Sequence, residues 1–446
     1  MKDWTAEQVA RAAGAELLRE GQGGPARVVI DSRVIAPGDL FVAIPGERVD
    51  GGRFAADALR AGAWGVLATP RWARSLDGGA VLAADDPVAA LGALARGWRR
   101  ALGARVIAVT GSVGKTSTKD LIAALVAPQR TVAASRANFN TEIGLPLELL
   151  AAPAGTEVLV LELAMRGFGQ IAELTGICEP DVAVITNIGP VHLEQVGSLE
   201  GVARAKAELL VGMRDGGVAV VPAGEERLAP YLRAELQVVT FGLGGDVRFA
   251  EEGSPVVLAG DERITLELPF ESRHNRTNTL AAVAAARAVG VRPEGRVDVA
   301  FGALRGERVV LARGATVIND CYNANPLSMR AALDDLATQE PAGRRVAVLG
   351  DMLELGSEEA AHHRAIGAYA GEAGVDVLIA VGPRSAAMLE SYAAGEAHAV
   401  PDAEAAAALA DTVVAGGDLV LVKGSRGVGL EVVAEALAGE RAGAGG

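Results

Sequence analysis

Short apolar runs alternate with longer amphipathic stretches along nearly the whole chain. The short runs end in glycine or polar residues and predict buried strands, whereas the longer stretches between them predict helices. This alternation is typical of α/β folds with mostly parallel sheets. In the first part of the chain, the predicted strands are 27–30, 39–44, 64–68 and 80–84, and the predicted helices are 53–62 and 87–102.

The same alternation continues to the C-terminal end in two further regions. The second region has predicted strands at 157–163, 181–187 and 218–221, a β-rich part at 237–270, and helices at 199–213 and 274–289. The third has predicted strands at 315–321, 345–350, 375–381 and 418–422. A chain of 446 residues is too long for one ordinary core. We therefore expect three α/β domains: a small one at 1–102, a central one with a mostly parallel sheet at 103–307, and a Rossmann-like one at 308–446.

Composition narrows the class of protein. The chain has 42 basic and 56 acidic side chains, and this net charge of -14 argues against a general nucleic-acid binder. The N-terminal residues do not resemble a signal peptide, and no apolar run approaches the roughly 18 residues of a membrane span. We expect a cytoplasmic protein with no membrane span. The only two cysteines, Cys178 and Cys321, are too few for a disulfide framework and are expected to be buried thiols.

The stretch 105–120 joins an apolar run to a predicted helix through two glycines. Gly111 and Gly114 allow the backbone to curl so that successive N–H groups face an anion, and Lys115 adds a positive charge where the helix begins. The motif is the short form Thr-Gly-x-x-Gly-Lys-Thr, because position 109 is Val109 and not glycine. An ordinary glycine turn is the alternative. The residues expected to hold the phosphates of a nucleoside triphosphate are Thr110, Gly111, Ser112, Val113, Gly114, Lys115, Thr116 and Ser117.

Polar residues follow several predicted strands, which is where α/β folds place ligands. Glu162 lies near the end of an apolar run, and a carboxylate there is costly unless it pairs with a cation, commonly Mg²⁺ in a phosphate-loop protein. His192 follows another strand, close to Asn187. A functional role for this histidine and an ordinary place in solvent are equally well supported. Lys206, on the helix 199–213, would by itself be interpreted as a surface lysine.

Other polar clusters leave structural alternatives open. Asp31, Ser32 and Arg33 suit either a ligand site or ordinary turn chemistry. Asn275 and Asn278 could read a base edge, whereas Asn275 or Thr277 could instead cap the helix that follows. The remaining clusters comprise Asn138, Asn140, Thr141, Asp320, Tyr322, Asn323 and Asn325.

In this order, the motifs resemble those of the Mur ligases of peptidoglycan synthesis, ATP-dependent enzymes that extend a UDP-linked muramoyl peptide. The resemblance covers nearly the whole chain. The N-terminal Asp-Ser-Arg and Pro-Gly-Asp-Leu-Phe-Val-Ala-Ile-Pro-Gly motifs are similar to those of both the third and the fourth ligase of the pathway. The motifs Asp-Cys-Tyr-Asn-Ala-Asn-Pro-Leu-Ser-Met and Gly-Asp-Met-Leu-Glu-Leu-Gly resemble the branch that adds D-alanyl-D-alanine to UDP-N-acetylmuramoyl tripeptide.

The resemblance implies an ATP-dependent peptide ligase that uses Mg²⁺ and an acyl-phosphate intermediate. It implies that Thr116 and Glu162 hold Mg²⁺, that His192 binds or neighbours a second Mg²⁺, and that Lys206 is carbamylated by CO₂ to become an anionic ligand. Lys115, Lys206, His192 and Glu162 are then the expected catalytic residues. Further ATP contacts are implied for Asn275, Asn278 and Asp320. Contacts with the UDP-linked substrate or the dipeptide are implied for Asp31, Ser32, Arg33, Asn138, Asn140, Thr141, Tyr322, Asn323 and Asn325.

The chain departs from the family pattern in a few places. Family members commonly have Leu-Glu-Leu-Gly-Met-Ser followed by Gly-Glu-Ile, whereas this chain has Ala164, Arg166 and Gln170. Arg204 stands where many relatives have another lysine, so Lys206 is the only candidate for the carbamate.

Three alternative functions remain: a diaminopimelate- or lysine-adding ligase, a folylpolyglutamate synthase-like ligase, and a small-molecule kinase. The Tyr-Asn-Ala-Asn-Pro run argues against the first two. We expect small-molecule substrates, no nucleic-acid partner, a monomer, and a C-terminal domain that moves. The sequence does not specify whether the tripeptide carries diaminopimelate or lysine at its third position.

Overall fold

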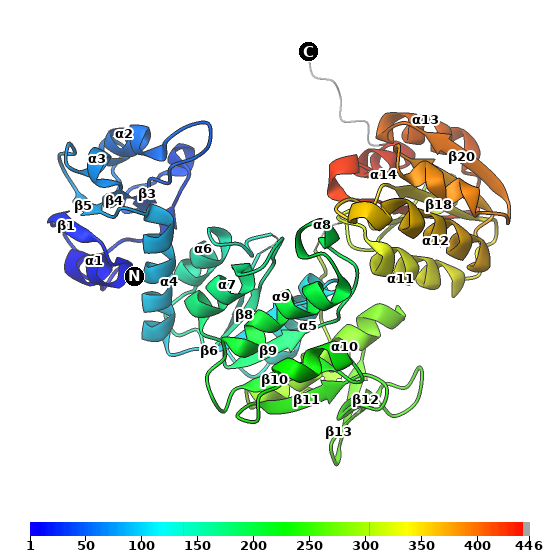
Figure 1. Cartoon of the computed structure of the whole chain (residues 1–446), viewed down its shortest axis with the longest axis horizontal. Coiled ribbons are helices and arrows are strands. Elements are labelled where there is room, and N and C mark those ends of the chain that lie inside the picture. The colour runs from blue at the N-terminus through cyan, green and yellow to red at the C-terminus, as the bar shows by residue number, and fades with distance from the viewer. Residues whose placement is uncertain (137, 303, 440–446) are drawn as a thin grey trace.

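The structure, a computed structural model, describes residues 1–136, 138–302 and 304–439. Its strands form three sheets that follow one another along the chain (Figure 1). The expected mixed α/β class is confirmed. Among the described residues, no helix combines the length and the apolar character needed to cross a bilayer.

The N-terminal sheet has five strands in the order β1-β5-β4-β3-β2. Its strands are parallel except β1, which runs antiparallel to β5. The four predicted strands are present, but β1 was missed because this edge strand is largely exposed and has no apolar run. The elements are α1 (Ala6–Ala13), β1 (Glu16–Arg19), β2 (Val28–Val29), η1 (Ser32–Val34), β3 (Leu40–Val42), η2 (Gly51–Phe54), α2 (Ala55–Arg60), β4 (Gly65–Ala68), α3 (Pro70–Ala73) and β5 (Ala80–Ala83).

Helix α4 (Pro87–Leu102) connects the N-terminal and central parts of the molecule. It begins where Asp86 accepts hydrogen bonds from the next turn and Pro87 occupies the first position, a favourable start for a helix. Leu94 and Trp98 are buried in one continuous core that includes residues of α1 and of α6 (Gly144–Ala151). In Figure 1, α4 stands between the two parts and contributes to both.

The central sheet has ten strands in the order β15-β14-β13-β12-β11-β10-β9-β6-β8-β7. The strands from β7 to β12 are parallel, whereas β12, β13 and β14 form an antiparallel meander. Helices α5 and α10 contribute to the core on one face of the sheet, and α6, α7 and α9 to the core on the other. The strands are β6 (Arg105–Thr110), β7 (Val132–Ala134), β8 (Val158–Glu162), β9 (Val182–Ile185), β10 (Val218–Pro222), β11 (Gln237–Phe241), β12 (Val247–Phe249), β13 (Val256–Ala259), β14 (Glu262–Glu267) and β15 (Gly295–Arg296). The remaining helices are α5 (Lys115–Val126), α7 (Gln170–Cys178), α8 (Leu193–Val196), α9 (Leu199–Val211), η3 (Glu226–Tyr231) and α10 (Arg273–Ala288).

The C-terminal sheet has six strands in the order β16-β17-β21-β18-β19-β20. All neighbouring pairs are parallel except β16 and β17. The buried side chains of this part form clusters of their own. The strands are β16 (Glu307–Val310), β17 (Thr316–Asn319), β18 (Arg345–Gly350), β19 (Val377–Val381), β20 (Glu396–Val400) and β21 (Leu419–Lys423). The helices are α11 (Pro326–Ala337), η4 (Gly356–Glu358), α12 (Glu359–Glu372), η5 (Ser385–Glu390), α13 (Ala403–Val413), η6 (Arg426–Val428) and α14 (Glu431–Leu437).

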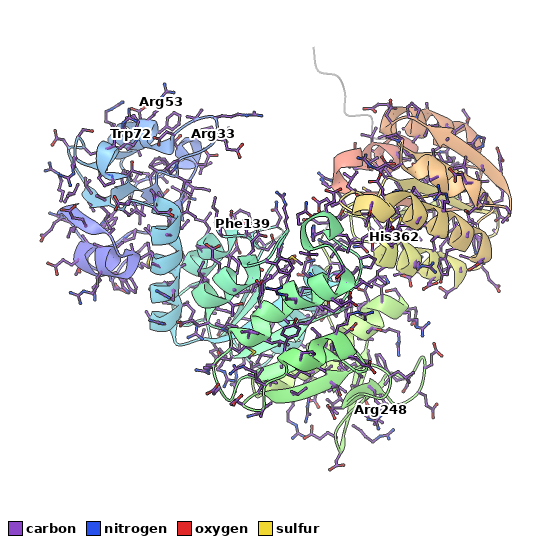
Figure 2. All side chains as sticks on the ribbon, viewed as in Figure 1. Arg33, Arg53, Trp72, Phe139, Arg248 and His362 are labelled. Atoms are coloured by element: carbon purple, nitrogen blue, oxygen red, sulfur yellow. The ribbon has the colours of Figure 1, made fainter. Side chains whose placement is uncertain are left out.

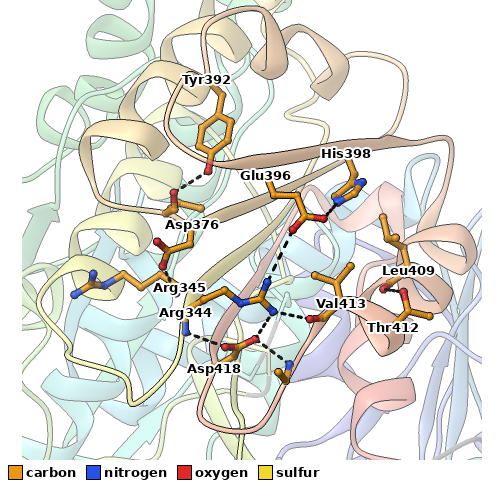
Figure 3. A network of polar contacts seen from close by, with 12 residues as sticks. Arg344, Arg345, Asp376, Tyr392, Glu396, His398, Leu409, Thr412, Val413 and Asp418 are labelled. Atoms are coloured by element: carbon orange, nitrogen blue, oxygen red, sulfur yellow. Dashed lines mark hydrogen bonds and ion pairs between the residues drawn. The ribbon is translucent and has the colours of Figure 1, made fainter.

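A polar network fixes the amino ends of the parallel strands in the C-terminal sheet (Figure 3). Arg344 donates to the Asp418 carboxylate at 2.9 Å, and the backbone N–H of Arg345 donates to Asp376 at 2.8 Å. Burial alone would raise the pKa of Asp418, but the hydrogen bonds from Arg344 and from backbone N–H groups lower it. The network lies at the edge opposite the carboxyl ends of the strands, where ligands bind, so we assign it a structural role.

We propose the divisions at 102/103 and 307/308 as domain boundaries and use the names N-terminal, central and C-terminal domain below. Helix α4 ends at the first boundary, and β16 begins one residue before the second. The end of the third range, 440–446, lies outside the described residues.

Candidate active site

The phosphate loop follows β6 at the carboxyl edge of the central sheet and ends at the start of α5. Gly111 and Gly114 have φ angles of 150° and 81°, and Gly114 is in the left-handed region that favours glycine. A Cβ atom at Gly111 would lie 1.9 Å from Thr186 Oγ1, and one at Gly114 would lie 2.6 Å from Asn278 Oδ1. Both glycines are therefore required by close neighbours as well as by the turn.

The loop is held in shape by residues that follow β9. Asn187 accepts a hydrogen bond from the backbone N–H of Val113 and donates one to its carbonyl, both at 2.9 Å. The Ser112 hydroxyl donates to the carbonyl of Gly189 and accepts from its N–H. Asn187 was not among the predicted site residues, although its place at a strand end was a signal. The loop is thus preformed for an anion.

Lys115 is half-buried at the first position of α5, and its ammonium group donates to the carbonyl of Gly111 at 3.0 Å. Burial lowers the pKa of Lys115, Glu162 opposes this effect, and Arg305 adds to it. Arg305 comes from the segment that leads into the C-terminal domain and was not predicted. Its guanidinium group lies over the ring of Tyr322, 4.0 Å from the centroid. Arg305 therefore contacts Tyr322 of the C-terminal domain and also adds positive charge in the surroundings of Lys115.

Two predicted metal ligands meet at the end of β8. Glu162 is 3% exposed, and the Thr116 hydroxyl donates to its Oε2 at 2.7 Å. Asn140 donates to Oε1 at 2.9 Å. A hydroxyl and a carboxylate at the start of a phosphate-loop helix are the oxygen donors that suit Mg²⁺. The residues present therefore fit this ion.

His192 adopts a left-handed conformation, with φ of 53°, at the start of α8. Its Nδ1 contacts the carboxylate of Glu354 from the C-terminal domain. Burial lowers the pKa of His192, Glu354 opposes this effect, and the positive charges of Lys206 and Lys115 lower it further. Glu354 lies within the Gly-Asp-Met-Leu-Glu-Leu-Gly motif, but no role was predicted for it.

Lys206 lies on α9 and is 2% exposed. Interpreting it as a surface lysine is therefore wrong: α9 packs with this side chain toward the core. Burial, followed by the charge of Lys115, lowers the pKa of Lys206 well below its usual value. The guanidinium group of Arg204 lies over the exposed ring of Phe168 at 4.9 Å, so it does not share this environment.

The predicted metal ligands do not form a cluster of the usual acidic and histidine type. Within 1–136, 138–302 and 304–439, no group of three or more His, Cys, Asp and Glu side chains could hold a metal ion. The proposed set depends on a threonine hydroxyl and a modified lysine, which such a group does not include.

Of the departures from the family pattern, Gln170 has a local structural role. The amide oxygen of Gln170 accepts hydrogen bonds from the backbone N–H groups of Arg166 and Gly167. Glu208 accepts from Gly169 and Ala172 at the start of α7. Both contacts shape the turn before α7, while Glu162 at the end of β8 keeps its own partners.

Asn275 and Asn278 lie on α10, buried, with their amides 3.3 Å apart. The capping alternative is wrong, because α10 begins at Arg273 and Thr277 donates its hydroxyl to the Arg273 carbonyl one turn back. The contact between Asn278 and Gly114 places this asparagine beside the phosphate loop. A role at the adenine stays a prediction.

The C-terminal cluster is organised by Lys423, at the end of β21, which was not predicted as a site residue. Its buried ammonium group binds the Asp320 carboxylate at 2.6 Å and the Asn323 carbonyl at 3.1 Å. The amide oxygen of Asn325 accepts from the N–H of Ser328 and caps α11. Asn325 therefore has a structural function, whatever its role toward substrate.

The predicted residues of the N-terminal domain lie away from the phosphate loop. Asp31 caps η1, and the exposed Arg33 folds back onto it, which lowers the pKa of Asp31 to about 2. Asp31 and Phe139 line a cleft of about 790 Å³ between the N-terminal and central domains. Figure 2 labels Arg33 and Phe139 on these two domains. Because Asn140 contacts Glu162, the loop that lines the cleft also reaches the proposed metal site.

Comparison with known proteins gives this site a context. Three family models match: "Mur ligase family, catalytic domain" at 26–72, "Mur ligase middle domain" at 109–286, and "Mur ligase, glutamate ligase domain" at 304–426. The UDP-N-acetylmuramoyl-tripeptide--D-alanyl-D-alanine ligase of Bacillus subtilis is 37% identical over 92% of this chain and 92% of its own length. The chain belongs to the Mur ligase family.

Solved structures of the Mur ligase family agree with the fold. A crystal structure of MurF from Acinetobacter baumannii matches with a TM-score of 0.88 and 31% identity, over 98% of this chain and 99% of that one. The MurF ligase of Thermotoga maritima in complex with ADP matches with a TM-score of 0.81 and 30% identity, over 93% and 97%. The predicted resemblance to Mur ligases is confirmed.

Proposed function

We propose that this chain joins D-alanyl-D-alanine to UDP-N-acetylmuramoyl tripeptide with cleavage of ATP, giving the UDP-linked pentapeptide. The similarity to the Bacillus subtilis ligase over nearly the whole chain supports the substrates. The observation that carries the proposal is the preformed phosphate loop with Thr116 and Glu162 in contact at its end. The ADP complex of the Thermotoga maritima relative supports ATP as the nucleotide.

The reaction requires two anions, the tripeptide carboxylate and ATP, to approach each other. The loop N–H groups and Lys115 bind the phosphates and reduce this repulsion. The carboxylate attacks the γ-phosphorus and ADP leaves, which gives an acyl phosphate. The amino group of D-alanyl-D-alanine then attacks the acyl carbon, and the tetrahedral intermediate collapses with loss of inorganic phosphate and a proton. The protein mainly positions the three substrates.

Thr116 and Glu162 would hold Mg²⁺, and His192 would bind or neighbour a second ion. When bound, Mg²⁺ supplies positive charge that stabilises the transferring phosphoryl group. Glu162 is held ready by Thr116 and Asn140, so it does not have to move into place.

Carbamylation of Lys206 is part of the proposal. The neutral amine reacts with CO₂, a C–N bond forms, and one proton is released, leaving an anionic carbamate. Because burial lowers the pKa of Lys206 well below its usual value, the neutral amine that this reaction needs is favoured. The carbamate then balances the charge of Lys115 and offers oxygen atoms to a metal ion.

The cleft between the N-terminal and central domains is the proposed path of the UDP-linked peptide. Asp31, Ser32 and Arg33 would hold its nucleotide end, and Asn138, Asn140 and Thr141 its peptide end. Asp320, Tyr322, Asn323 and Asn325 would face ATP and the dipeptide from the C-terminal domain. We also propose that the protein is a monomer and acts in the cytoplasm.

The test is a phosphate-release assay with ATP and UDP-muramoyl tripeptide, with and without D-alanyl-D-alanine. We expect release that depends on the dipeptide and equals the amount of pentapeptide formed. Release that is indifferent to the dipeptide would contradict the proposal. A stable phosphorylated product without peptide-bond formation would instead indicate a kinase.

A further inference from the structure

His192 of the central domain and Glu354 of the C-terminal domain share an uncommon backbone conformation. Both have positive φ angles, 53° and 62°, which non-glycine residues rarely adopt. They are in direct contact through Nδ1 of the imidazole and a carboxylate oxygen. Two strained residues from different domains are therefore in contact, and one of them is the histidine that the proposed function places beside a metal ion.

The surroundings hold Glu354 firmly in this position. Met352 and Leu355, on either side of it, are buried in the core of the C-terminal domain. The N–H of Leu353 donates to the Ser425 hydroxyl at 3.0 Å. Gly356, with φ of 67°, lies close against Glu194 in the first turn of α8. The loop is thus anchored on both sides of a half-buried carboxylate that points at the other domain.

The pair itself is too exposed to be explained by stability. The side chains of His192 and Glu354 are 26% and 41% exposed, and even a fully charged pair with this exposure contributes little to folding. However, a carboxylate that accepts from one ring nitrogen of a histidine fixes the ring orientation and leaves the other nitrogen free. In this structure Nδ1 faces Glu354, so Nε2 is the nitrogen that remains for a metal ion.

We infer that Glu354 is a positioning residue that orients His192 for the second metal ion, so that the C-terminal domain completes a metal site of the central domain. This inference rests on the proposed metal role of His192. It links the position of the C-terminal domain to metal binding, because the carboxylate reaches His192 only when the two domains are in contact.

A second histidine–carboxylate pair across the same interface provides a matched control. His274 Nδ1 on α10 lies 2.9 Å from Asp335 Oδ2 on α11, without hydrogen-bond geometry. Neither residue belongs to the proposed metal site. Asp335→Asn therefore weakens another interdomain contact between a histidine and a carboxylate without removing a partner of His192.

The experiment measures Mn²⁺ binding by electron paramagnetic resonance in the full chain with a non-hydrolysable ATP analogue, so no turnover is needed. Wild type is expected to bind two Mn²⁺, one with the nitrogen hyperfine coupling of an imidazole ligand. Glu354→Ala should weaken the nitrogen-coupled site at least about tenfold and leave the other unchanged. Glu354→Gln should lie between, because its amide oxygen can still accept the Nδ1 proton.

Asp335→Asn should bind both ions as wild type does, and thermal melts should show that all variants are folded. The inference is overturned if Glu354→Ala binds Mn²⁺ like wild type, or if Asp335→Asn weakens the same site equally. The phosphate-release assay on wild type distinguishes a failure of the proposed function from a failure of the inferred role of Glu354. Two-ion binding without dipeptide-dependent release would refute the proposed function and leave the role of Glu354 standing.

Discussion

Glu162 shows how one buried carboxylate is placed for chemistry by its neighbours. Its two oxygens are divided between Thr116 and Asn140, one from the phosphate-loop helix and one from the loop at the cleft. A buried carboxylate that accepts from a neutral hydroxyl and a neutral amide retains acceptor capacity that a cation can use. The sequence predicts a metal ligand here, because an acidic residue ends an apolar run, and this role stays a prediction. The contact with Asn140 depended on tertiary folding.

Glu162→Gln tests this arrangement. The amide removes the negative charge and turns one –NH₂ group toward a donor. We therefore expect the rate of phosphate release to fall at least about a hundredfold and the Mg²⁺ concentration needed for activity to rise. Stability should fall by about 1–3 kcal/mol from the unsatisfied group. Glu148→Gln is the control, since Glu148 is also buried but pairs with Arg136. Equal loss of activity in both variants would argue against a metal role.

Lys206→Met tests the buried lysine through stability as well as activity. In CO₂-free buffer the folded protein disfavours the ammonium form, since burial lowers its pKa. The unfolded chain therefore binds more protons, and the stability of unmodified wild type should rise with pH from the lowered pKa up to the ordinary 10.5. Methionine removes this penalty.

At pH 7 we accordingly expect Lys206→Met to melt at a higher temperature than CO₂-free wild type and to be inactive. Adding bicarbonate should stabilise and activate wild type only. A methionine variant that melts lower than CO₂-free wild type would show that the lysine is already satisfied without modification.

At the scale of elements, the phosphate loop depends on what packs against it. Gly114→Ala adds a methyl group that meets Asn278 in a backbone conformation with φ of 81°. We expect a large loss of ATP affinity and a cost above the roughly 1 kcal/mol of left-handed strain. Gly14→Ala is the matched control, because Gly14 has φ of 63° and nothing within 4 Å of the added atom. Calorimetry of ATP-analogue binding to both variants tests this prediction. Unchanged affinity in Gly114→Ala would mean that Asn278 moves aside freely.

Elements with strong apolar patterns were predictable, and those on edges were not. The range of α4 was predicted without error because Asp86, Pro87 and the buried stripe through Leu94 and Trp98 all mark it. Strand β20 was missed, since this edge strand is half-exposed and has no apolar run. In the same way, Lys206 was recognised by resemblance, whereas its burial could be known only from the packing of α9.

At the scale of the molecule, the three domains are joined unequally. The N-terminal and central domains share one hydrophobic core through α4. This core includes Leu94 of α4 and Leu149 of α6. The C-terminal domain has its own clusters and meets the central domain through smaller contacts, among them the pairs formed by His192 and His274. Shared cores resist bending because separating them exposes apolar surface, whereas a few polar contacts can exchange at little cost.

We therefore expect ATP and the UDP-linked substrate to move the C-terminal domain and to leave the angle between the other two unchanged. Pairs of spin labels at exposed positions measure the distance between the central and C-terminal domains and the distance between the N-terminal and central domains. The labelled positions are Asp77→Cys in the N-terminal domain, Leu243→Cys in the central domain and Val310→Cys in the C-terminal domain. The native cysteines are buried, so they should not be labelled.

With an ATP analogue and substrate, the distance from position 243 to 310 should change and narrow in distribution, while that from 77 to 243 should stay constant. The second pair is the internal control for label mobility. Identical distances for both pairs with and without ligands would contradict domain movement. A change in the 77–243 distance alone would show that the core shared through α4 is the hinge, which is the reverse of what its burial implies.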